Sequence, residues 1–270
     1  MTTAGGPLEA FDLTGKAALI TGAGSGIGRA TAVMLGAVGA SVMCADVDEA
    51  AAEATAGVIA QAGGTARARG TDVTSAADVD GAVADVVAEH GRLDVMANIA
   101  GIIVGGTVVD MTDDDFDRVL AVNLRGVFYG CRAAARVMQE QGYGSIVNMA
   151  SAAIDTPAAG LSGYSMTKAA VAQLTRNLAM EVAGRGVRVN AVAPGFVLTA
   201  MTGRHFINAD GSMDEERREA ALAPMRRRTP LQDIGRPEDI AYAVLYLCSD
   251  AARFVTGQIV RPNGGVAMPW

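Results

Sequence analysis

Positive charge is scarce in this chain. Its 270 residues carry 22 basic and 29 acidic side chains, which gives a net charge of −7 and a pI of about 4.9. Proteins that bind nucleic acid or an anionic membrane surface need positive charge to neutralise phosphates. The composition therefore argues against both kinds of partner.

Cysteine and histidine are rarer still. Cys44, Cys131 and Cys248 show no CxxC spacing, and the two histidines, His90 and His205, are far apart. This pattern favours reduced thiols in a cytoplasmic protein over a disulfide framework, and it gives no support to a histidine-based zinc site. We expect a protein without a metal centre.

Long hydrophobic runs are also absent. The longest, Ile240–Cys248, has nine residues, against the roughly 20 that a membrane-spanning helix needs. The stretch through Leu13 has neither the basic start nor the apolar core of a secretory signal. We expect no membrane segment and no export. Because 50% of the residues are hydrophobic and only 19% are charged, the chain can bury a large core.

Short runs rich in Val, Ile and Ala alternate with longer segments of helical character. The predicted strands are Ala17–Thr21, Ser41–Ala45, Thr65–Gly70, Asp94–Ala97, Ser145–Met149, Val187–Ala193 and Gln258–Arg261. Parallel strands need connections of about a dozen residues or more, usually helices. The sequence therefore predicts a single α/β domain over residues 1–270, with a doubly wound, seven-stranded parallel sheet and helices on both faces.

One interval of about forty residues, 195–236, interrupts the alternation. Long connections in compact domains are often lids or binding loops. We interpret residues 196–232 as a flap that covers a substrate; a surface helical hairpin is the alternative for its middle part. The apolar residues of this interval are Met201, Phe206, Met213, Leu222 and Met225.

A glycine-rich turn follows the first predicted strand and leads directly into a predicted helix. Its glycines, Gly22, Gly26 and Gly28, have the spacing GxxxGxG. Glycines allow backbone N–H groups to approach a pyrophosphate, and a helix N-terminus favours its charge. A tight turn that merely needs small residues is the alternative.

The second predicted strand leads to Asp46, 18 residues beyond Gly28. A carboxylate there can accept hydrogen bonds from the ribose hydroxyls of an adenine dinucleotide and would repel a 2′-phosphate. Ser25 and Val47, its neighbours in the expected fold, are both uncharged. These residues predict NAD(H) rather than NADP(H), unless Asp46 only caps the next helix.

Tyr164 and Lys168 are four residues apart, one turn on the same face of a predicted helix. The chain has only two lysines, so chance would place about 0.04 such pairs in it. A free phenol has a pKa near 10, and a nearby ammonium stabilises the phenolate by about 3 to 4 kcal/mol at an effective dielectric of about 20. We expect Lys168 to lower the pKa of Tyr164, so that this tyrosine acts as a general acid and base.

Two polar residues accompany this pair. Ser151 follows the fifth predicted strand, at the sheet edge where open α/β sheets bind ligands, and its hydroxyl can hold a substrate oxygen. Asn123 is an amide in the middle of a long predicted helix, where propensity does not favour it. It could orient a water or a backbone group behind Lys168. Taken singly, both residues could also be structural.

The ordered set of motifs resembles the short-chain dehydrogenase/reductase family from about Leu13 to Pro262. The resemblance implies a Rossmann-type fold, a catalytic tetrad of Asn123, Ser151, Tyr164 and Lys168, and homotetramers built through the helices around 113–141 and 164–184. It implies that Lys168 bonds the nicotinamide ribose, that Asp72 and Val73 contact the adenine, and that Val197 and Thr199 hold the carboxamide. The cofactor set implied in full is Gly22, Ser25, Gly26, Ile27, Gly28, Asp46, Asp72, Val73, Asn98, Ala100, Gly101, Tyr164, Lys168, Pro194, Gly195, Val197 and Thr199.

The chain departs from the family pattern at two places. Ile99 stands where many members have a second Asn, and Asn263-Gly264-Gly265 stands where many have Asp-Gly-Gly. The first departure removes one polar contact and the second removes a C-terminal charge. Neither affects proton transfer.

The predicted reaction is hydride transfer between NAD(H) and a secondary alcohol or ketone, with Tyr164 exchanging the proton. The expected substrate contacts are Ser151, Ile154, Leu161, Tyr164 and Phe196, joined by Ile102 and Ile103. This mostly apolar set favours a cyclic or aryl small molecule of modest size over a sugar.

Two alternatives remain open from the sequence. A 3-oxoacyl-thioester reductase could use Arg132 and Arg136, on one predicted helix face, to dock an acidic carrier protein, although the face could simply be solvated. A protein that binds NAD(H) without chemistry is the other alternative, and the Tyr164, Lys168 and Ser151 set argues against it. The sequence does not indicate whether the tail 268–270 reaches a neighbouring subunit.

Overall fold

A parallel sheet of seven strands forms the centre of the molecule. The structure, a computed structural model, describes residue 6, residues 8–203, residue 206 and residues 214–269. Within these residues the strand order is β3-β2-β1-β4-β5-β6-β7, and every neighbouring pair is parallel. The predicted fold class is confirmed.

The strands lie within one or two residues of the predicted positions. They are β1 (Ala17–Thr21), β2 (Ser41–Asp46), β3 (Thr65–Gly70), β4 (Val95–Asn98), β5 (Gly144–Met149), β6 (Val187–Val192) and β7 (Ile259–Val260). Both faces of β1 are covered, because Leu19 and Ile20 are fully buried but belong to opposite hydrophobic clusters. This explains why the strand reads as a continuous apolar run rather than an alternating one.

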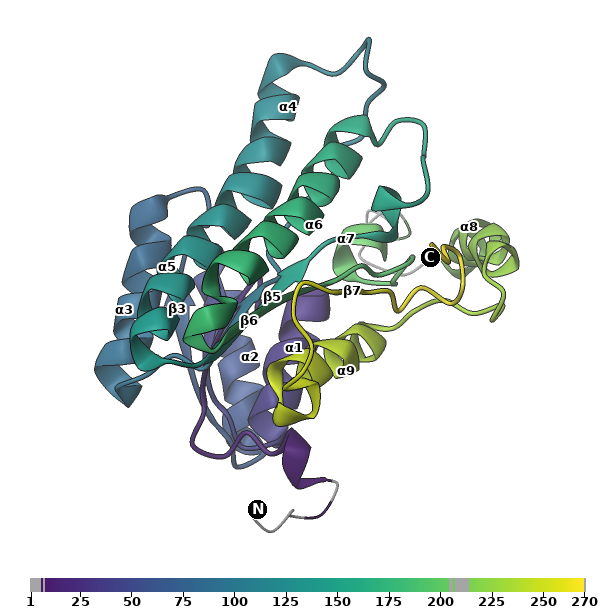
Figure 1. Cartoon of the computed structure of the whole chain (residues 1–270). Coiled ribbons are helices and arrows are strands. Elements are labelled where there is room, and N and C mark those ends of the chain that lie inside the picture. The colour runs from purple at the N-terminus through teal and green to yellow at the C-terminus, as the bar shows by residue number, and fades with distance from the viewer. Residues whose placement is uncertain (1–5, 7, 204–205, 207–213, 270) are drawn as a thin grey trace.

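Helices cover both faces of the sheet (Figure 1). One cluster joins the sheet to α1 (Gly26–Ala37), α2 (Glu49–Gln61) and α9 (Pro237–Cys248). The other joins it to α3 (Ala76–His90), α5 (Gly126–Gln141) and α6 (Ser162–Val182). The two apolar layers enclose the sheet as a doubly wound fold requires.

The predicted long helix around 113–141 is interrupted. It consists of α4 (Asp113–Leu120), a π-helical turn at Ala121–Arg125, and α5. π-turns inside α-helices are rare and occur often at functional sites. Asn123 lies at the centre of this turn, where a regular α-helix was expected.

The predicted flap contains two short elements in its described part. They are α7 (Ala200–Gly203) and α8 (Glu215–Arg228). Leu222 and Phe206 are buried, so the segment is anchored to the rest of the chain. Met213 and His205 lie outside the described residues.

The order in which strands are added to the sheet reverses at β1. The chain runs from β1 outward to β2 and β3, then returns to place β4 on the other side of β1. Thr21 and Asn98, at the ends of β1 and β4, are register partners. In doubly wound folds, the carboxyl edge at such a reversal point opens a crevice where ligands bind.

Candidate active site

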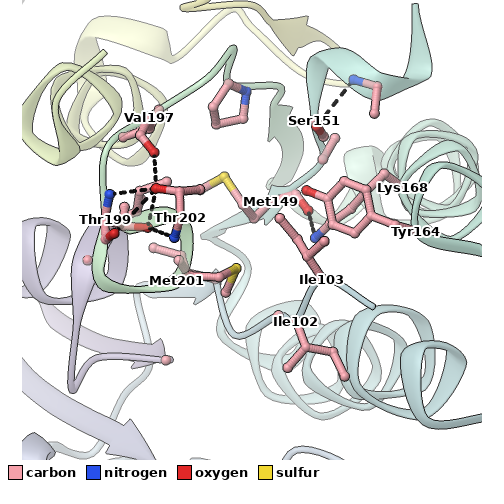
Figure 2. Close-up of a pocket in the computed structure, with 18 of the residues that line it drawn as sticks. Ile102, Ile103, Met149, Ser151, Tyr164, Lys168, Val197, Thr199, Met201 and Thr202 are labelled. Atoms are coloured by element: carbon pink, nitrogen blue, oxygen red, sulfur yellow. Dashed lines mark hydrogen bonds between the residues drawn. The ribbon is translucent and has the colours of Figure 1, made fainter. Parts of the chain in front are cut away.

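A cavity of about 640 Å³ lies at the carboxyl edge of the sheet. Residues that follow each of the six strands β1 to β6 contribute to its lining, and so do residues of α4, α7 and α8. Figure 2 shows side chains from these separate segments meeting around one space. The fold therefore brings together most of the residues singled out in the sequence.

The glycine-rich turn forms one end of the cavity, and close packing explains its glycines. Gly22 and Gly26 have positive φ values of 71° and 52°. A Cβ atom on Gly28 would stand 1.9 Å from the carbonyl oxygen of Gly22, and one on Gly22 would stand 2.8 Å from Ala100 Cα. Side chains cannot be accommodated at these positions without moving backbone.

The N-terminus of α1 lacks the side-chain cap that α2, α3 and α4 have. The side chains of Asp48, Ser75 and Thr112 accept hydrogen bonds from the first turns of α2, α3 and α4. Ser25, at the same position before α1, makes no such bond. The backbone N–H groups of this turn therefore keep their donor capacity and a partial positive charge, which suits a phosphate.

Asp46 lies beside this turn and lines the cavity. Its Oδ2 accepts a hydrogen bond from Gly24 N at 2.8 Å, and its Oδ1 accepts one from Asp48 N at 3.0 Å. The alternative in which Asp46 caps the next helix is wrong, because Asp48 caps α2 by accepting from Ala51 N. Asp46 instead fixes the glycine-rich turn to the end of β2.

Asp72 and Val73 follow β3 and also line the cavity. Asp72 is exposed, and its Oδ1 accepts hydrogen bonds from the backbone N and the hydroxyl of Thr74 at 2.8 and 2.7 Å. Val73 is buried, and a Cβ on Gly126 would lie 3.0 Å from its side chain. The start of α5 thus packs closely on the loop after β3 at this side of the cavity.

Tyr164, Lys168 and Ser151 lie together at the centre of the cavity wall (Figure 2). Lys168 Nζ donates a hydrogen bond to Met149 O at 2.8 Å and lies 5.7 Å from the centre of the Tyr164 ring. Ser151 Oγ accepts one from Ala153 N at 3.2 Å. The helix α6 and the end of β5 therefore present a phenol, an ammonium and a hydroxyl to the same space.

Burial dominates the ionisation of this group. It raises the pKa of Tyr164, against a smaller lowering by the hydrogen bond with Ser151, and it lowers the pKa of Lys168 to about 8. The expectation that Lys168 lowers the pKa of the phenol is not met in this structure, because both groups are withdrawn from water and both charged forms are disfavoured. The raised pKa favours the protonated form of Tyr164.

Asn123 is fully buried, and both the oxygen and the nitrogen of its amide make hydrogen bonds with neighbouring residues. Its Oδ1 accepts from Ile102 N at 2.8 Å, while its Nδ2 donates to Ile102 O at 2.9 Å and to Thr167 Oγ1 at 3.3 Å. These bonds join the π-turn to the loop after β4. A Cβ on Gly101 would lie 3.2 Å from Asn123 Oδ1 and 3.5 Å from Lys168 Nζ, so Asn123 and Lys168 both lie close to the face of this glycine where a side chain would be.

Asn98 does not line the cavity with its neighbours Ile99, Ala100 and Gly101. Its side chain is buried and donates to Asn148 Oδ1 at 2.8 Å. Asn148 in turn donates to Thr175 Oγ1 at 3.0 Å. The structure thus gives Asn98 a place in a polar network that joins β4, β5 and α6.

The remaining residues of the implied cofactor set all line the cavity. They are Gly22, Ser25, Gly26, Ile27, Gly28, Asp46, Asp72, Val73, Ala100, Gly101, Tyr164, Lys168, Pro194, Gly195, Val197 and Thr199. Of the two departures from the family pattern, Ile99 lines the cavity, whereas Asn263 is buried and holds the C-terminal turn through Gly265 N and Ala267 O.

The other end of the cavity is largely apolar. Leu161 and Phe196 line it as expected, but Ile154 does not and instead packs against Ala150, Ala191 and Ala193. The reason is that Ser151 starts a short 3₁₀ turn, Ala152–Ile154, which points this side chain back toward the sheet. The predicted flap reaches the cavity through Met201 and Met225, but Arg228 was not singled out within it. Val266 was missed, because nothing in its local pattern shows that the C-terminal turn reaches the cavity.

No group of three or more His, Cys, Asp or Glu residues is arranged to hold a metal ion within the described part of the chain. The three cysteines are free and buried. Among the helices that the structure describes, none combines the length and apolar character of a membrane span.

Comparison with known proteins decides the family. A family model described as enoyl-(acyl carrier protein) reductase matches residues 22–267. A crystal structure of a short-chain type dehydrogenase/reductase from Mycobacterium marinum is 35% identical, with a TM-score of 0.87 over 97% of this chain and 99% of that one. The chain belongs to the short-chain dehydrogenase/reductase family.

Two further relatives of this dehydrogenase/reductase cover nearly its whole length. The 3-oxoacyl-(acyl-carrier-protein) reductase FabG of Thermotoga maritima is 38% identical over 95% of this chain and 99% of its own. A 7α-hydroxysteroid dehydrogenase, solved with NADH and 7-oxo glycochenodeoxycholic acid, is 33% identical with a TM-score of 0.87, over 98% of this chain and 99% of its own. The chain is thus an oxidoreductase of a family that uses a nicotinamide cofactor.

Proposed function

We propose that this protein interconverts a secondary alcohol and a ketone with NAD(H), acting on a modest-sized, largely apolar cyclic or aryl substrate. The observation that carries the proposal is the position of Tyr164, whose hydroxyl shares an apolar cavity with Lys168 and Ser151. The hydroxysteroid dehydrogenase relative was solved with NADH and 7-oxo glycochenodeoxycholic acid, which supports this choice of cofactor and substrate class.

In this proposal Tyr164 gives its proton to the carbonyl oxygen during reduction and takes it back from the alcohol during oxidation. Ser151 holds the same oxygen, and its bond with Ala153 N keeps the hydroxyl in place. Lys168, held by Met149 O, places positive charge beside the phenol when a phenolate has to form. A bound nicotinamide supplies or accepts the hydride.

The residues at the glycine end fit such a cofactor. The uncapped N-terminus of α1 and the side-chain-free turn beside it suit a pyrophosphate. Asp46 supports NAD(H) over NADP(H), because its charge would repel a 2′-phosphate, while Ser25 and Val47 bring no positive charge. The other members of the set, from Asp72 to Thr199, are proposed to hold the adenine and the carboxamide as the family pattern implies.

Asn123 is proposed as a positioning residue. Its paired hydrogen bonds with Ile102 fix the loop that separates the glycine end from Tyr164. Its full burial and its satisfied amide favour this role over direct contact with the substrate.

The cytoplasm and a homotetramer are the proposed setting. The three free, buried thiols suit a reducing compartment. Helices α5 and α6 expose Phe128, Met166 and Met180, and exposed apolar side chains on adjacent helices are expected where subunits meet. Light scattering coupled to gel filtration should give four times the chain mass of 27.5 kDa.

The second candidate is a 3-oxoacyl-thioester reductase, which the resemblance to the Thermotoga enzyme favours. Arg136 is exposed on α5, as docking an acidic carrier would need. Arg132 is less suitable, since its guanidinium lies over the rings of Phe128 and Tyr129 at 5.7 and 5.2 Å.

The deciding experiment is a panel of cyclic and aryl ketones, sugars and acetoacetyl thioesters, run with NADH and NADPH on the native enzyme and on Tyr164→Phe. The proposal predicts turnover of ketones with NADH and its loss in the variant. Turnover of sugars only, or of thioesters with NADPH at a far higher rate than with NADH, would contradict it. Tight NADH binding without turnover of any carbonyl would favour a binding protein instead.

A further inference from the structure

The cavity carries opposite charges at its two ends. Its acidic lining residues, Asp46 and Asp72, both lie at the ends of strands β2 and β3. At the end formed by α8, the lining includes Arg228 and no acidic residue among those the structure describes. A charged group at an otherwise apolar end of a cavity is a specificity feature, because such sites carry few polar groups and use them to orient the ligand.

Arg228 differs from Arg218 and Arg226 of the same helix in having no partner among the residues that the structure describes. Arg218 pairs with Glu215 at 2.8 Å, and Arg226 pairs with Glu219 at 2.5 Å. Within the described residues, Arg228 makes no hydrogen bond or ion pair, and its side chain is exposed. Its guanidinium is therefore available to a ligand in the cavity.

The other lining residues of the flap and the C-terminal turn carry no charge. They include the apolar residues Phe196, Met201, Met225 and Val266 and the hydroxyl residues Thr199, Thr202 and Thr229. Lys168 cannot take its place, because it is buried and already bonded to Met149 O. Arg118, another arginine of the lining, comes from α4 and lies one turn before Val122 of the π-turn. The helix that continues from there packs on Val73, after β3, so Arg118 comes from a different part of the lining than α8.

We infer that Arg228 recognises an anionic group on the substrate. The substrate class is a ketone or secondary alcohol whose apolar body ends in a carboxylate, sulfonate or phosphate. The planar guanidinium of arginine offers paired donors that match the oxygens of these anions. This inference rests on the proposed function, and it adds a charged end to a substrate whose reacting carbon lies near Tyr164.

The experiment compares two ketones that differ in charge with little change in size: an aryl keto carboxylate and its methyl ester. Both are reduced by the native enzyme, Arg228→Gln and Arg227→Gln. Arg227 is the matched control, because it is the neighbouring exposed arginine of the same helix end but does not line the cavity. Acetoacetyl-CoA, whose phosphates offer the same anionic chemistry on a thioester, is the third substrate.

The native enzyme should prefer the carboxylate to its ester by roughly tenfold or more in kcat/KM, as expected for a charge-assisted hydrogen bond. Arg228→Gln should remove this preference through KM and leave the ester unaffected, and Arg228→Lys should restore part of it. Arg227→Gln should behave as the native enzyme, and the KM for NADH should not change in any variant. If Arg228→Gln lowers kcat/KM for acetoacetyl-CoA but not for the keto carboxylate, the anion that Arg228 recognises is a phosphate of the CoA moiety. The inference of a small anionic substrate would then be overturned.

Other outcomes contradict the inference directly. One such outcome is that the native enzyme reduces the carboxylate and its ester equally well. Another is that Arg227→Gln lowers activity as much as Arg228→Gln, which would indicate that both arginines only stabilise the C-terminus of α8 through its dipole. Failure of the proposed function looks different, since the native enzyme would then turn over neither ketone with either cofactor. Thermal unfolding should show the same Tm for all variants, because both arginines are exposed.

Discussion

The two ends of the cavity are built in different ways. The glycine end is made by strand ends and backbone: Gly22 and Gly28 leave no room for side chains, and the first turn of α1 presents unused N–H groups. The opposite end is made by side chains of α7, α8 and the C-terminal turn, such as Met201, Met225 and Val266.

The difference separates what is fixed by the fold from what can vary. The backbone cradle, which is the turn with Gly22, Gly26 and Gly28, cannot take side chains without being disturbed. It therefore suits the cofactor, which is the same for every substrate. Side chains on a long connection can change without altering the sheet. We therefore expect substitutions at the glycine end to affect every substrate equally, and those at the other end to affect one substrate against another.

After Tyr164 itself, the largest expected effect lies between the two ends, at Lys168. Lys168→Met should lower kcat by about 100-fold or more, as loss of acid–base assistance does. Lys16→Met, which removes the other lysine of the chain, should change kcat by less than about twofold. Lys16 lies outside the cavity lining and pairs with Asp94 at 3.6 Å. Steady-state kinetics with NADH measure both.

Lys168→Met should also change how the free energy of unfolding depends on pH. Burial lowers the pKa of Lys168 from 10.5 to about 8 in the folded state. Below pH 8 the folded protein must bury the Lys168 ammonium, so the full free-energy cost of burying this charge lowers the stability of the fold. This cost disappears as the pH rises toward 10.5. The free energy of unfolding of Lys168→Met relative to the native protein should therefore fall as pH rises from 8 to 10.5. A difference that is constant with pH would contradict the buried charge.

A substitution in the backbone cradle should come next in size. Gly28→Ala should destabilise the fold by about 1 to 3 kcal/mol and weaken NADH binding, because its Cβ would stand 1.9 Å from Gly22 O. Gly57→Ala, on α2 with nothing within 4 Å of its Cβ, is the control. It should be neutral or stabilise by up to about 1 kcal/mol. Chemical denaturation and fluorescence titration measure both effects, and equal results for the two variants would refute the cradle.

Asp46 tests the cofactor preference. Asp46→Asn keeps an acceptor for Gly24 N but loses the charge, so the ratio of kcat/KM for NADH to that for NADPH should fall by roughly tenfold. Asp48→Asn should retain the native ratio, since asparagine is also a good N-cap of α2. An unchanged ratio in Asp46→Asn would mean that the charge does not select the cofactor.

The smallest effects are expected at the substrate end. Phe196→Ala should raise KM for an aryl ketone by about three- to tenfold through lost apolar contact and leave NADH binding unchanged. Ile154→Ala should leave KM unchanged and lower the free energy of unfolding by about 1 to 3 kcal/mol, because Ile154 packs on Ala150 and Ala191. If Ile154→Ala raised KM and left the free energy of unfolding unchanged, Ile154 would be a substrate contact after all.

The sequence predicted the sheet because most of its strands, though not β3 with Arg67 and Arg69, are apolar runs bounded by glycine turns and capping residues. It predicted the lining of the glycine end for a related reason: Gly22 directly follows β1, and Asp46 ends β2. The π-turn at Asn123 could not be foreseen, since it depends on hydrogen bonds with Ile102, 21 residues away. Neither could the contact of Ile154 with Ala191, nor the choice of Arg228 among the residues of the predicted flap, because both depend on how distant segments pack.

The raised pKa of Tyr164 was also beyond the sequence. A spacing of four residues predicts that two side chains are neighbours, but it does not predict how far both are withdrawn from water. Burial works against the ionised form of each group and exceeds the attraction expected between them.

The most direct test of Tyr164 as the proton-transferring group is the pH dependence of kcat/KM with NADH and NAD⁺ in the native enzyme and in Tyr164→Phe. Because burial raises the pKa of the phenol, ketone reduction should hold through neutral pH and fall only on the alkaline side, while alcohol oxidation should rise with pH. Tyr164→Phe should lose about 10²- to 10⁴-fold in activity and both pH limbs, yet still bind NADH. If the variant keeps the native profile and rate, Tyr164 does not transfer the proton.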